Sequence, residues 1–356
     1  MTSEGAIRDA PGSVFLELTR ECPLRCRHCR AGEARSGKEL GERELEHVVD
    51  QLIGLGARTV VLTGGEPIAR DGWERIAGRL ARGGVRVRLF TSGFGADADL
   101  AARAIDAGVA EFAVSIDGPR STHDALRPEV GERARSSFDA AVDLVRRLAA
   151  GGCAVRVVTA VNGINAPHLG EVYELVKELS VARWQVQLCQ NLGRSAERSA
   201  DLMLPAEVLE EIVVALLRAA RERIVLAPLH CTVGYMTEEE PLLRNRESPG
   251  PPVWRGCGAG IRTLCITADG DVKGCAALPD AFAAASLRER SLEEIWEDDR
   301  LFPHSRAWSH KLLAGACAAC AFRETCRAGC PAVAYGATGS IGLNPYCLRL
   351  VRKKRG

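Results

Sequence analysis

Three cysteines close to the N-terminus are spaced for iron–sulfur chemistry. Cys22, Cys26 and Cys29 follow the pattern C-x3-C-x2-C. Three thiolates on one short loop can each bind a different iron of a 4Fe-4S cluster. The fourth iron then keeps an open position, as metal sites do in catalysis. Zinc is the alternative, because His28 would complete a Cys3His set, but zinc usually binds paired C-x2-4-C motifs. We therefore expect a cluster, with His28 beside it rather than bound to it.

A second group of cysteines lies near the C-terminus. Eight of the 14 cysteines lie between Cys257 and Cys347, and five of these follow the pattern C-x2-C-x5-C-x3-C-x16-C. In a secreted chain this number would suggest disulfides, whereas in a reducing cytoplasm it indicates metal. This region is rich in glycine, with a helix expected only at about residues 291–300, so metal clusters would substitute for a small apolar core. We interpret the three scattered cysteines as buried thiols: Cys153, Cys189 and Cys231.

Composition excludes some classes of function. Lys+Arg total 47 and Asp+Glu total 46, so no overall field favours nucleic acid or an anionic membrane as a partner. The basic run 352–355 is expected to be a solvated tail. No segment has the roughly 20 apolar residues that span a bilayer, and no signal peptide is evident, so the cytoplasm is the expected compartment.

Apolar runs and helical patterns alternate through the first two thirds of the chain. The runs predict strands at Val14–Leu18, Thr59–Leu62, Val85–Thr91, Glu111–Ile116, Val155–Val161 and Arg183–Leu188. Periodicity predicts helices at about 42–55, 71–83, 97–107, 138–150, 168–179 and 205–223. Strand–helix units in series favour a parallel sheet with helices outside. Periodicity alone does not distinguish an open sheet from a partial barrel.

Each predicted strand ends in a polar or glycine-rich cluster. The clusters are 19–29, 63–67, 91–93, 115–118, 162–165 and 190–191. Because α/β folds place ligands at the carboxyl ends of their strands, six clusters in register predict one site on one rim. The third, fifth and sixth clusters are equally compatible with ordinary turns. Polar residues near the same rim receive no assigned role: Asp117, His123, Asp124, Gln187 and Asn191.

The first two clusters together resemble the radical AdoMet superfamily. The C-x3-C-x2-C motif follows the first predicted strand, and Gly64-Gly65-Glu66-Pro67 follows the second. Glycine lets the backbone approach a ligand closely. The resemblance implies an enzyme with a partial (β/α)6 TIM-like barrel. It further implies that a 4Fe-4S cluster on the three cysteines binds S-adenosylmethionine (AdoMet).

The same resemblance implies which residues contact AdoMet. The GGEP segment would bind the methionine amino group, and Ser92 would lie near the ribose. Ser115 and Arg127 would lie near the ribose and the methionine carboxylate, for which a guanidinium has suitable bidentate geometry. A surface role is the alternative for Arg127.

The C-terminal cysteines resemble the SPASM extension, which carries two auxiliary 4Fe-4S clusters. By position, the resemblance assigns the outer cluster to Cys317, Cys320, Cys326 and Cys347. It assigns three ligands of the inner cluster to Cys257, Cys275 and Cys330. Cys265 is the one cysteine placed to be the fourth ligand, but it lies in an apparent strand and is equally interpretable as a buried thiol. If Cys265 is not a ligand, the inner cluster keeps an open iron that could bind substrate. A zinc ribbon at 317–330 is the alternative.

The resemblance also implies the chemistry. One electron from the reduced cluster would cleave AdoMet to a 5′-deoxyadenosyl radical, which abstracts hydrogen from the substrate. The auxiliary clusters would accept an electron from the substrate, making the reaction oxidative, and a flavodoxin or ferredoxin would be the electron donor.

Three functions remain open from the sequence. The first is a maturase that oxidatively modifies a ribosomal peptide or protein side chain. Because the barrel begins at about Val14, such a maturase would need a separate peptide-recognition protein or a site on the barrel rim. The second is a haem-pathway or other small-molecule enzyme, to which the motif Cys26-Arg27-His28-Cys29-Arg30-Ala31 is similar. The third is a non-catalytic electron-transfer protein, which would have no use for a GGEP segment.

The expected organisation has five parts. A disordered tail at 1–12 precedes a radical AdoMet core at 13–235. A linker or loop at 236–252, rich in Glu, Pro, Arg and Gly, leads to a SPASM domain at 253–348. The basic tail at 349–356 ends the chain.

Overall fold

One nine-stranded sheet organises the residues that the structure describes, which are 9–30, 38–131, 135–181, 183–197, 201–222, 233–244 and 254–355 of this computed structural model. The strand order is β6-β5-β4-β3-β2-β1-β7-β8-β9. The strands are β1 (Ser13–Glu17), β2 (Thr59–Thr63), β3 (Arg86–Thr91), β4 (Val109–Ser115), β5 (Val155–Val161), β6 (Arg183–Leu188), β7 (Thr263–Ile266), β8 (Asp271–Lys273) and β9 (Ala283–Ser286). Strands β1 to β6 pair in parallel, β7 joins β1 in parallel, and β8 and β9 run antiparallel to their neighbours.

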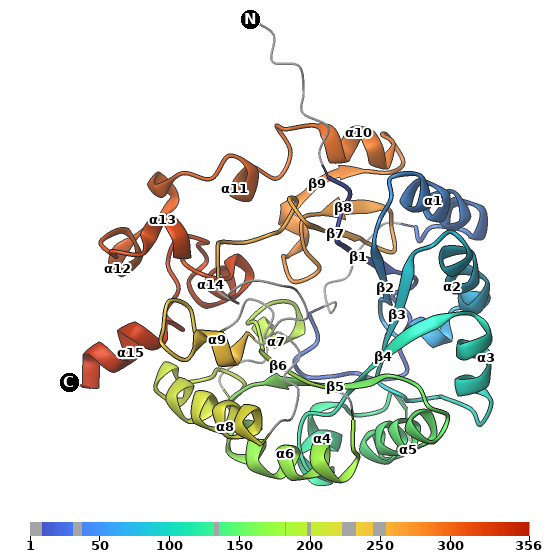
Figure 1. Cartoon of the computed structure of the whole chain (residues 1–356), viewed down its shortest axis with the longest axis horizontal. Coiled ribbons are helices and arrows are strands. Elements are labelled where there is room, and N and C mark those ends of the chain that lie inside the picture. The colour runs from blue at the N-terminus through green and yellow to red at the C-terminus, as the bar shows by residue number, and fades with distance from the viewer. Residues whose placement is uncertain are drawn as a thin grey trace, which may run out of the picture.

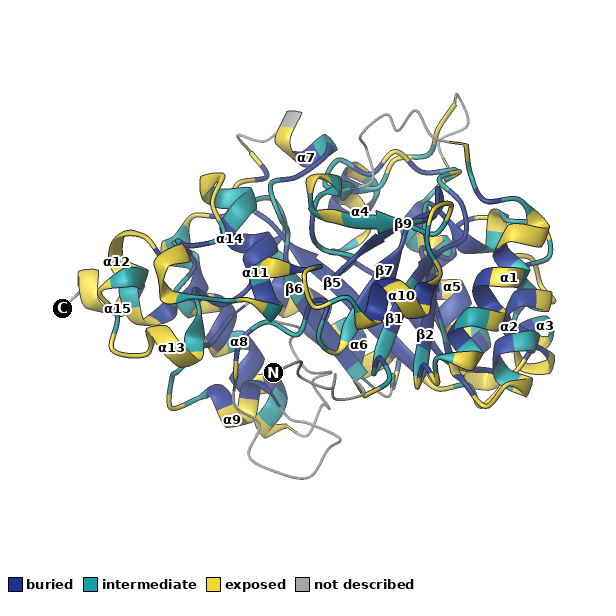
Figure 2. Cartoon of the chain, turned by 90° about the horizontal axis from the view of Figure 1, so that it is seen from above, coloured by how far each residue is buried: buried dark blue, intermediate teal, exposed yellow. Residues whose placement is uncertain are grey.

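The parallel part of the sheet is curved into a partial barrel, and helices cover its outer face (Figure 1). These helices are α1 (Glu42–Gly54), α2 (Trp73–Arg82), α3 (Leu100–Asp106), α5 (Ser137–Ala150), α6 (Leu169–Glu178) and α8 (Leu209–Arg221). The short helix α4 (Arg120–Leu126) instead lies at one end of the barrel (Figure 2). The predicted α/β barrel with a cysteine-rich C-terminal part is therefore confirmed, and each of the six predicted strands lies within two residues of its position.

Alternation along each strand separates the two faces of the sheet. Val14 and Leu16 are fully buried in the large core beneath the helices, whereas Phe15 points to the opposite face because successive side chains alternate. Phe15 meets Phe90 edge-on at 6.1 Å between ring centroids, although β2 lies between their strands. The two rings can meet across the intervening strand β2 because the sheet is concave on that face.

A buried ionic group fills the amino-terminal end of the barrel. Glu111 on β4 contacts Arg88 Nε at 2.7 Å, Arg156 Nη2 at 2.6 Å and Arg183 Nη1 at 3.3 Å. Burial opposes ionisation of Glu111, but Arg156 and Arg88 hold its pKa below the usual range. The three guanidinium groups thus join β3, β5 and β6 to β4 at the end of the barrel remote from the strand-end clusters.

The C-terminal part contains more helix than the single segment expected at 291–300. Helix α10 (Leu292–Glu297) is followed by α11 (Pro303–Arg306), α12 (Gly315–Ala318), α13 (Arg323–Cys326), α14 (Pro331–Thr338) and α15 (Leu348–Arg355). The five additional helices, α11 to α15, span only four to eight residues, too few for an apolar repeat to reveal them in the sequence. Figure 2 shows that α12, α13 and α15 lie at one end of the molecule with much exposed surface.

The basic run expected to be a solvated tail, 352–355, belongs to helix α15, and its residues 352–354 are exposed. Arg352 on α15 contacts Glu210 and Glu239, each at 2.8 Å, and α15 packs on α8. The basic residues at the end of the chain are therefore partly used to attach this helix.

The start of the expected linker is also structured. Helix α9 (Glu240–Leu243) begins with the buried Glu240, which accepts hydrogen bonds from the Trp254 backbone N–H at 2.6 Å and from Arg244 at 2.5 Å. Residues 245–252 of the expected linker and 1–8 of the expected tail lie outside the described residues. Within the described ranges, no helix has the length and apolar character needed to cross a membrane.

Candidate active site

The loop that carries Cys22, Cys26 and Cys29 follows the carboxyl end of β1. Cys26 is buried in a small apolar cluster with Leu24 and Phe94, against which Cys22 and Cys29 pack. Burial raises the pKa of Cys22 to about 11 and that of Cys26 to about 12, and the neighbouring sulfurs add to both shifts. The Leu24 N–H donates to Cys22 Sγ at 3.4 Å, which favours the thiolate form. Cys26 is therefore shielded from water, and the partly exposed Cys22 and Cys29 pack beside it.

The segment 126–130 runs antiparallel beside this cysteine loop. Backbone hydrogen bonds join Arg25 N to Pro128 O at 2.7 Å, Arg27 N to Leu126 O at 2.8 Å and Val130 N to Pro23 O at 2.8 Å. The residue between these contacts is Arg127, directly after α4. The backbone ladder therefore places the Arg127 side chain at the cysteine loop, so a solvent-exposed surface position is not what the structure shows.

The two glycines of the GGEP segment are required by the chain itself. A Cβ on Gly64 would lie 2.3 Å from Thr19 O, and a Cβ on Gly65 would lie 2.2 Å from Glu21 O. Gly65 N also donates to Thr19 O at 2.7 Å. The GGEP backbone is thus in direct contact with the residues that lead into Cys22, a reason for glycine different from the expected approach to a ligand.

Glu66 joins the GGEP segment to the end of β3. Its buried carboxylate accepts hydrogen bonds from Thr91 Oγ1 at 2.6 Å, Ser92 N at 2.8 Å and Ser92 Oγ at 2.5 Å. Burial raises the pKa of Glu66 despite these bonds. Pro67 is buried at the start of a short 3-10 turn, Pro67–Ala69. The second and third strand-end clusters are therefore one rigid unit.

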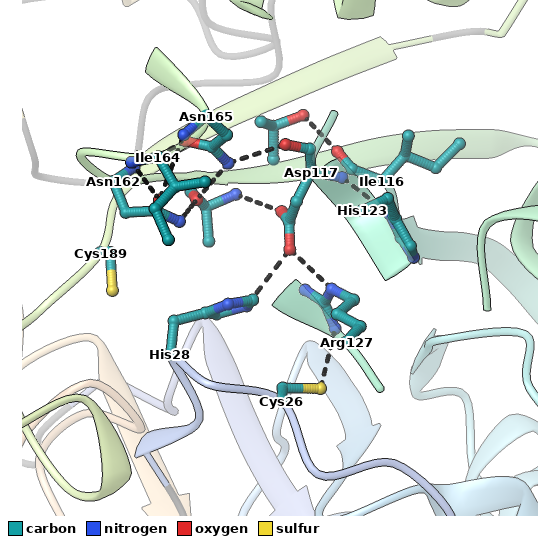
Figure 3. A network of polar contacts seen from close by, with 12 residues as sticks. Cys26, His28, Ile116, Asp117, His123, Arg127, Asn162, Ile164, Asn165 and Cys189 are labelled. Carbon is teal, nitrogen blue, oxygen red and sulfur yellow. Dashed lines mark hydrogen bonds and ion pairs between the residues drawn. The ribbon is translucent and has the colours of Figure 1, made fainter. Parts of the chain in front are cut away.

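Asp117 lies at the centre of the polar network drawn in Figure 3. Its Oδ2 accepts from Arg127 Nε at 2.6 Å and lies 3.2 Å from His28 Nε2, while Oδ1 accepts from Ala160 N at 2.8 Å. Burial alone would raise its pKa, but the charges of Arg127 and His28 hold the pKa of Asp117 well below its usual range. Arg127 Nη1 reaches 3.8 Å from Cys26 Sγ. Ser115 ends β4 and lies on the same face as Asp117.

The side chains of His123 and Asn165 both hydrogen-bond to the backbone of Asp117. Asp117 N donates to His123 Nδ1 at 3.1 Å, and Asn165 Nδ2 donates to Asp117 O at 2.8 Å. The first, fourth and fifth strand-end clusters thus meet at one residue. Gln187 belongs to β6, and Asn191 follows that strand on the border of a small cavity rather than in this network.

The C-terminal thiols form two groups. Cys257 lies close enough to Cys275 and Cys330 for their charges to raise its pKa beyond the effect of burial, and burial raises the pKa of Cys330 to about 12. In the same way Cys326, whose pKa burial raises to about 12, interacts with the other three members of the second group: Cys347, Cys317 and Cys320. The SPASM resemblance assigns the same cysteines to its two auxiliary clusters, and that assignment stays a prediction.

Backbone N–H groups point at several of these sulfurs. Ala259 N donates to Cys257, Ala277 N to Cys275 and Phe322 N to Cys320, each at 3.4 Å. In each case the donor is two residues after the cysteine, as at Cys22. Such bonds stabilise thiolate ligands and tune a cluster's potential, so the donor set is chemically suited to iron–sulfur clusters. No three His, Cys, Asp or Glu side chains in the described parts of the chain form a set that could hold a single metal ion.

Two family models match this chain. One is the Radical SAM superfamily, over residues 16–177, and the other is the SPASM iron-sulfur cluster-binding domain, over residues 257–321. The AdoMet-dependent heme synthase of Methanosarcina barkeri is 30% identical over 98% of this chain and 99% of that protein. The chain belongs to the Radical SAM superfamily. It is a radical SAM enzyme whose domains imply AdoMet, a 4Fe-4S cluster and auxiliary clusters.

Other radical SAM proteins are similar over most of their length. The mycofactocin maturase MftC of Mycobacterium tuberculosis is 29% identical over 96% of this chain and 84% of that protein. Among solved structures, native anSMEcpe with bound AdoMet and Kp18Cys peptide aligns with a TM-score of 0.73 at 16% identity, covering 97% of this chain and 95% of that one. SuiB of Streptococcus suis bound to its precursor peptide SuiA aligns with a TM-score of 0.72 at 16% identity, covering 95% and 75%. These structural likenesses confirm the fold.

Sequence reasoning missed one contact to the radical SAM cysteine loop. Arg194, at the start of α7 (Arg194–Glu197), donates from its backbone to Cys29 O at 3.0 Å and from Nη1 to Cys26 O at 2.8 Å. The preceding Gly193 packs so closely that a Cβ would lie 2.2 Å from Arg30 O. The only sequence feature that could have indicated these contacts is the Gly193-Arg194 pair just after the sixth strand-end cluster. This pair belongs to no known motif.

Proposed function

We propose that this chain reductively cleaves AdoMet and oxidatively modifies a side chain of a ribosomal peptide or protein. The observation that carries the proposal is the single rim where the GGEP segment and Arg127 both contact the loop that carries the three thiols. When bound there, a 4Fe-4S cluster on Cys22, Cys26 and Cys29 and its AdoMet ligand supply a 5′-deoxyadenosyl radical.

The protein's own residues would bind and orient AdoMet. Arg127, fixed by Asp117, would pair with the methionine carboxylate, since a buried guanidinium is a strong bidentate partner for a carboxylate. The GGEP segment, Gly64 to Pro67, would receive the amino group, and Ser92 and Ser115 would face the ribose. The apolar contacts around Cys26 would exclude water from the reacting atoms.

Two auxiliary clusters would bring the number of clusters to three. The outer one would use Cys317, Cys320, Cys326 and Cys347, and the inner one Cys257, Cys275 and Cys330. They would accept the electron that leaves the substrate, and a flavodoxin or ferredoxin would supply the electron for AdoMet cleavage. We divide the chain into a radical SAM core at 13–235 and a SPASM domain at 253–348.

A peptide substrate is supported by the relatives that modify peptides. MftC is named a maturase, and the SuiB and anSMEcpe structures hold peptides. A separate peptide-recognition protein would deliver the substrate, or the barrel rim would bind it directly.

A tetrapyrrole is the second candidate substrate. The specific observation in its favour is the end-to-end similarity to the M. barkeri heme synthase, which covers 99% of that protein. The short motif from Cys26 to Arg30 also resembles the haem-pathway branch.

Anaerobic reconstitution tests the first step of the proposal. Three clusters predict about twelve irons per chain, and dithionite with AdoMet should yield 5′-deoxyadenosine. Cys26→Ala should abolish that product and remove about four irons, whereas Cys153→Ala, at a half-buried cysteine outside all three groups, should change neither. Product formation by Cys26→Ala at the parental rate would show that the cysteine assignment is wrong. A parent chain that holds its clusters but makes no 5′-deoxyadenosine would favour an electron-transfer protein.

The substrate is tested separately with the active enzyme. Peptides encoded beside the gene and iron coproporphyrins should be incubated in parallel with reductant and AdoMet. A peptide mass change that depends on AdoMet supports the first candidate. A change in tetrapyrrole mass and absorbance with unchanged peptides would replace it with the second.

A further inference from the structure

The inner auxiliary group has three thiols, and within the described ranges of the chain no fourth cysteine faces Cys275 across the β7–β8 pair. In the antiparallel pair of β7 and β8, Cys265 is opposite Lys273, so continuing the register places Thr263 opposite Cys275. The Thr263 hydroxyl lies 2.9 Å from Gly274 O, to which it donates. The residue across from Cys275 is therefore Thr263, whose hydroxyl already donates a hydrogen bond to the backbone.

Cys265 lies deeper in the barrel and has other neighbours. Its Sγ is 4.0 Å from Glu17 Oε1 on β1. It is fully buried, and its pKa is raised by burial first and by Glu17 second, with Cys275 the weakest of the neighbours that act on it. Cys265 is thus associated with a carboxylate inside the sheet more closely than with the other thiols.

His304 lies near one thiol of the inner group. It borders a small cavity together with Cys257 and Pro331, the residue after Cys330. The His304 Nε2 atom is buried, and it has no hydrogen-bond partner in the described part of the chain. A buried ring nitrogen without a partner is costly unless a bound group satisfies it.

Several contacts fix the ring where it is. Arg306 Nε donates to Gly260 O at 2.7 Å, and Ser305 Oγ donates to Ala259 O, so α11 is attached to the loop that follows Cys257. The ring of His304 meets Phe282 edge-on at 5.6 Å between centroids, with an interplanar angle of 87°. Preorganisation of this kind is what a metal-binding histidine requires.

We propose that His304, through Nε2, and not Cys265, is the fourth protein ligand of the inner auxiliary cluster. The inference rests on the proposed function only in requiring that this cluster is present. Imidazole in place of a thiolate makes the cluster one charge more positive and raises its reduction potential, as it does in Rieske centres. That shift suits a cluster that accepts an electron from the substrate.

The test is spectroscopic and uses a full-length chain in which Cys22, Cys26 and Cys29 are replaced by Ala. This protein should hold about eight irons and report only the auxiliary clusters. Pulsed EPR of the reduced protein, prepared with 14N- or 15N-histidine, should show a histidine nitrogen coupling. His304→Cys should keep the iron, lose the coupling and lower the inner cluster's reduction potential, while the exposed His310→Ala should change none of these.

Three results would overturn the inference. They are the absence of a histidine coupling in the parent protein, its persistence in His304→Cys, and a loss of inner-cluster iron in Cys265→Ala matching that in Cys275→Ala. AdoMet cleavage by the chain with all its cysteines is scored independently. An enzyme that makes 5′-deoxyadenosine without a histidine-bound cluster would refute this inference alone.

Discussion

Arg127 connects Asp117 to Cys26: its Nε donates to Asp117 Oδ2 at 2.6 Å, and its Nη1 lies 3.8 Å from Cys26 Sγ. The guanidinium therefore joins a strand end to the cysteine loop. The single ammonium group of a lysine cannot make both of these contacts at once.

Arg127→Lys should therefore weaken AdoMet binding while leaving the iron content unchanged. We expect a KM for AdoMet raised by roughly 10- to 100-fold, the usual cost of losing a supporting group beside a metal site. The measurement is 5′-deoxyadenosine formation over a range of AdoMet concentrations. Arg120→Lys, at an exposed pair with Asp139, is the control, and a parental KM in Arg127→Lys would contradict the role.

The order of strands and the groups of cysteines were predictable, because both depend on spacing along the chain. Val155–Val161 and Arg183–Leu188 form strands at the predicted residues. Helix α4 was missed because its seven residues, Arg120–Leu126, have no extended apolar repeat. Arg194 was missed because its contacts depend on how α7 meets the cysteine loop, and local sequence carries no record of such a contact.

Gly65→Ala should disrupt the first cluster selectively. The new methyl group would lie 2.2 Å from Glu21 O and 2.5 Å from Arg20 O, and backbone atoms cannot yield without moving the loop that carries Cys22. We expect a loss of up to about four irons of about twelve, with the auxiliary clusters intact by EPR.

Gly170→Ala provides the matched control for this substitution. Gly170 is in helix α6, and a Cβ there meets nothing within 4 Å. Its iron content and activity should equal those of the parent. Equal iron in both variants would mean that the contact between GGEP and the loop is not rigid.

His123 should make the free energy of unfolding fall as the pH is lowered from about 6.5 to about 4. Burial first, and Arg127 second, lower the pKa of His123 to about 4, whereas in the unfolded chain it is about 6.5. Below pH 6.5 the unfolded chain therefore binds a proton that the folded chain does not, and stability falls by as much as ~1.4 kcal/mol per pH unit until about pH 4. Asp117 and Asp124 oppose this shift, while His28 adds to it.

Urea unfolding at pH 7.5, 6.5 and 5.5 measures this dependence. His123→Asn retains an acceptor for the Asp117 N–H but cannot titrate, so its loss of stability between pH 6.5 and 5.5 should be smaller than the parent's by up to ~1.4 kcal/mol. Parallel curves for the two proteins would show that His123 already titrates normally in the folded state.

Glu111→Gln should destabilise the fold without altering the rim. Removing this carboxylate leaves the buried Arg156 without its ion-pair partner, and breaking a buried pair costs about 3–5 kcal/mol. Urea unfolding should show this loss, while AdoMet cleavage per folded molecule stays at the parental value. The exposed pair of Glu178 with Arg146 is the control, and Glu178→Gln should change stability by less than about 1 kcal/mol.

Strand β7 lies along β1 and shares its hydrogen bonds, so the two halves of the chain cannot be exchanged as independent parts. A chimera that replaced everything after residue 253 would have to bring a strand whose edge fits β1. Without one, β1 would present unpaired N–H and C=O groups to solvent and invite aggregation. The same pairing makes the strand that leads into the cysteine loop a direct neighbour of the β7–β8 hairpin that leads to Cys275, so any separation of the two parts of the chain would have to break the backbone hydrogen bonds of this sheet.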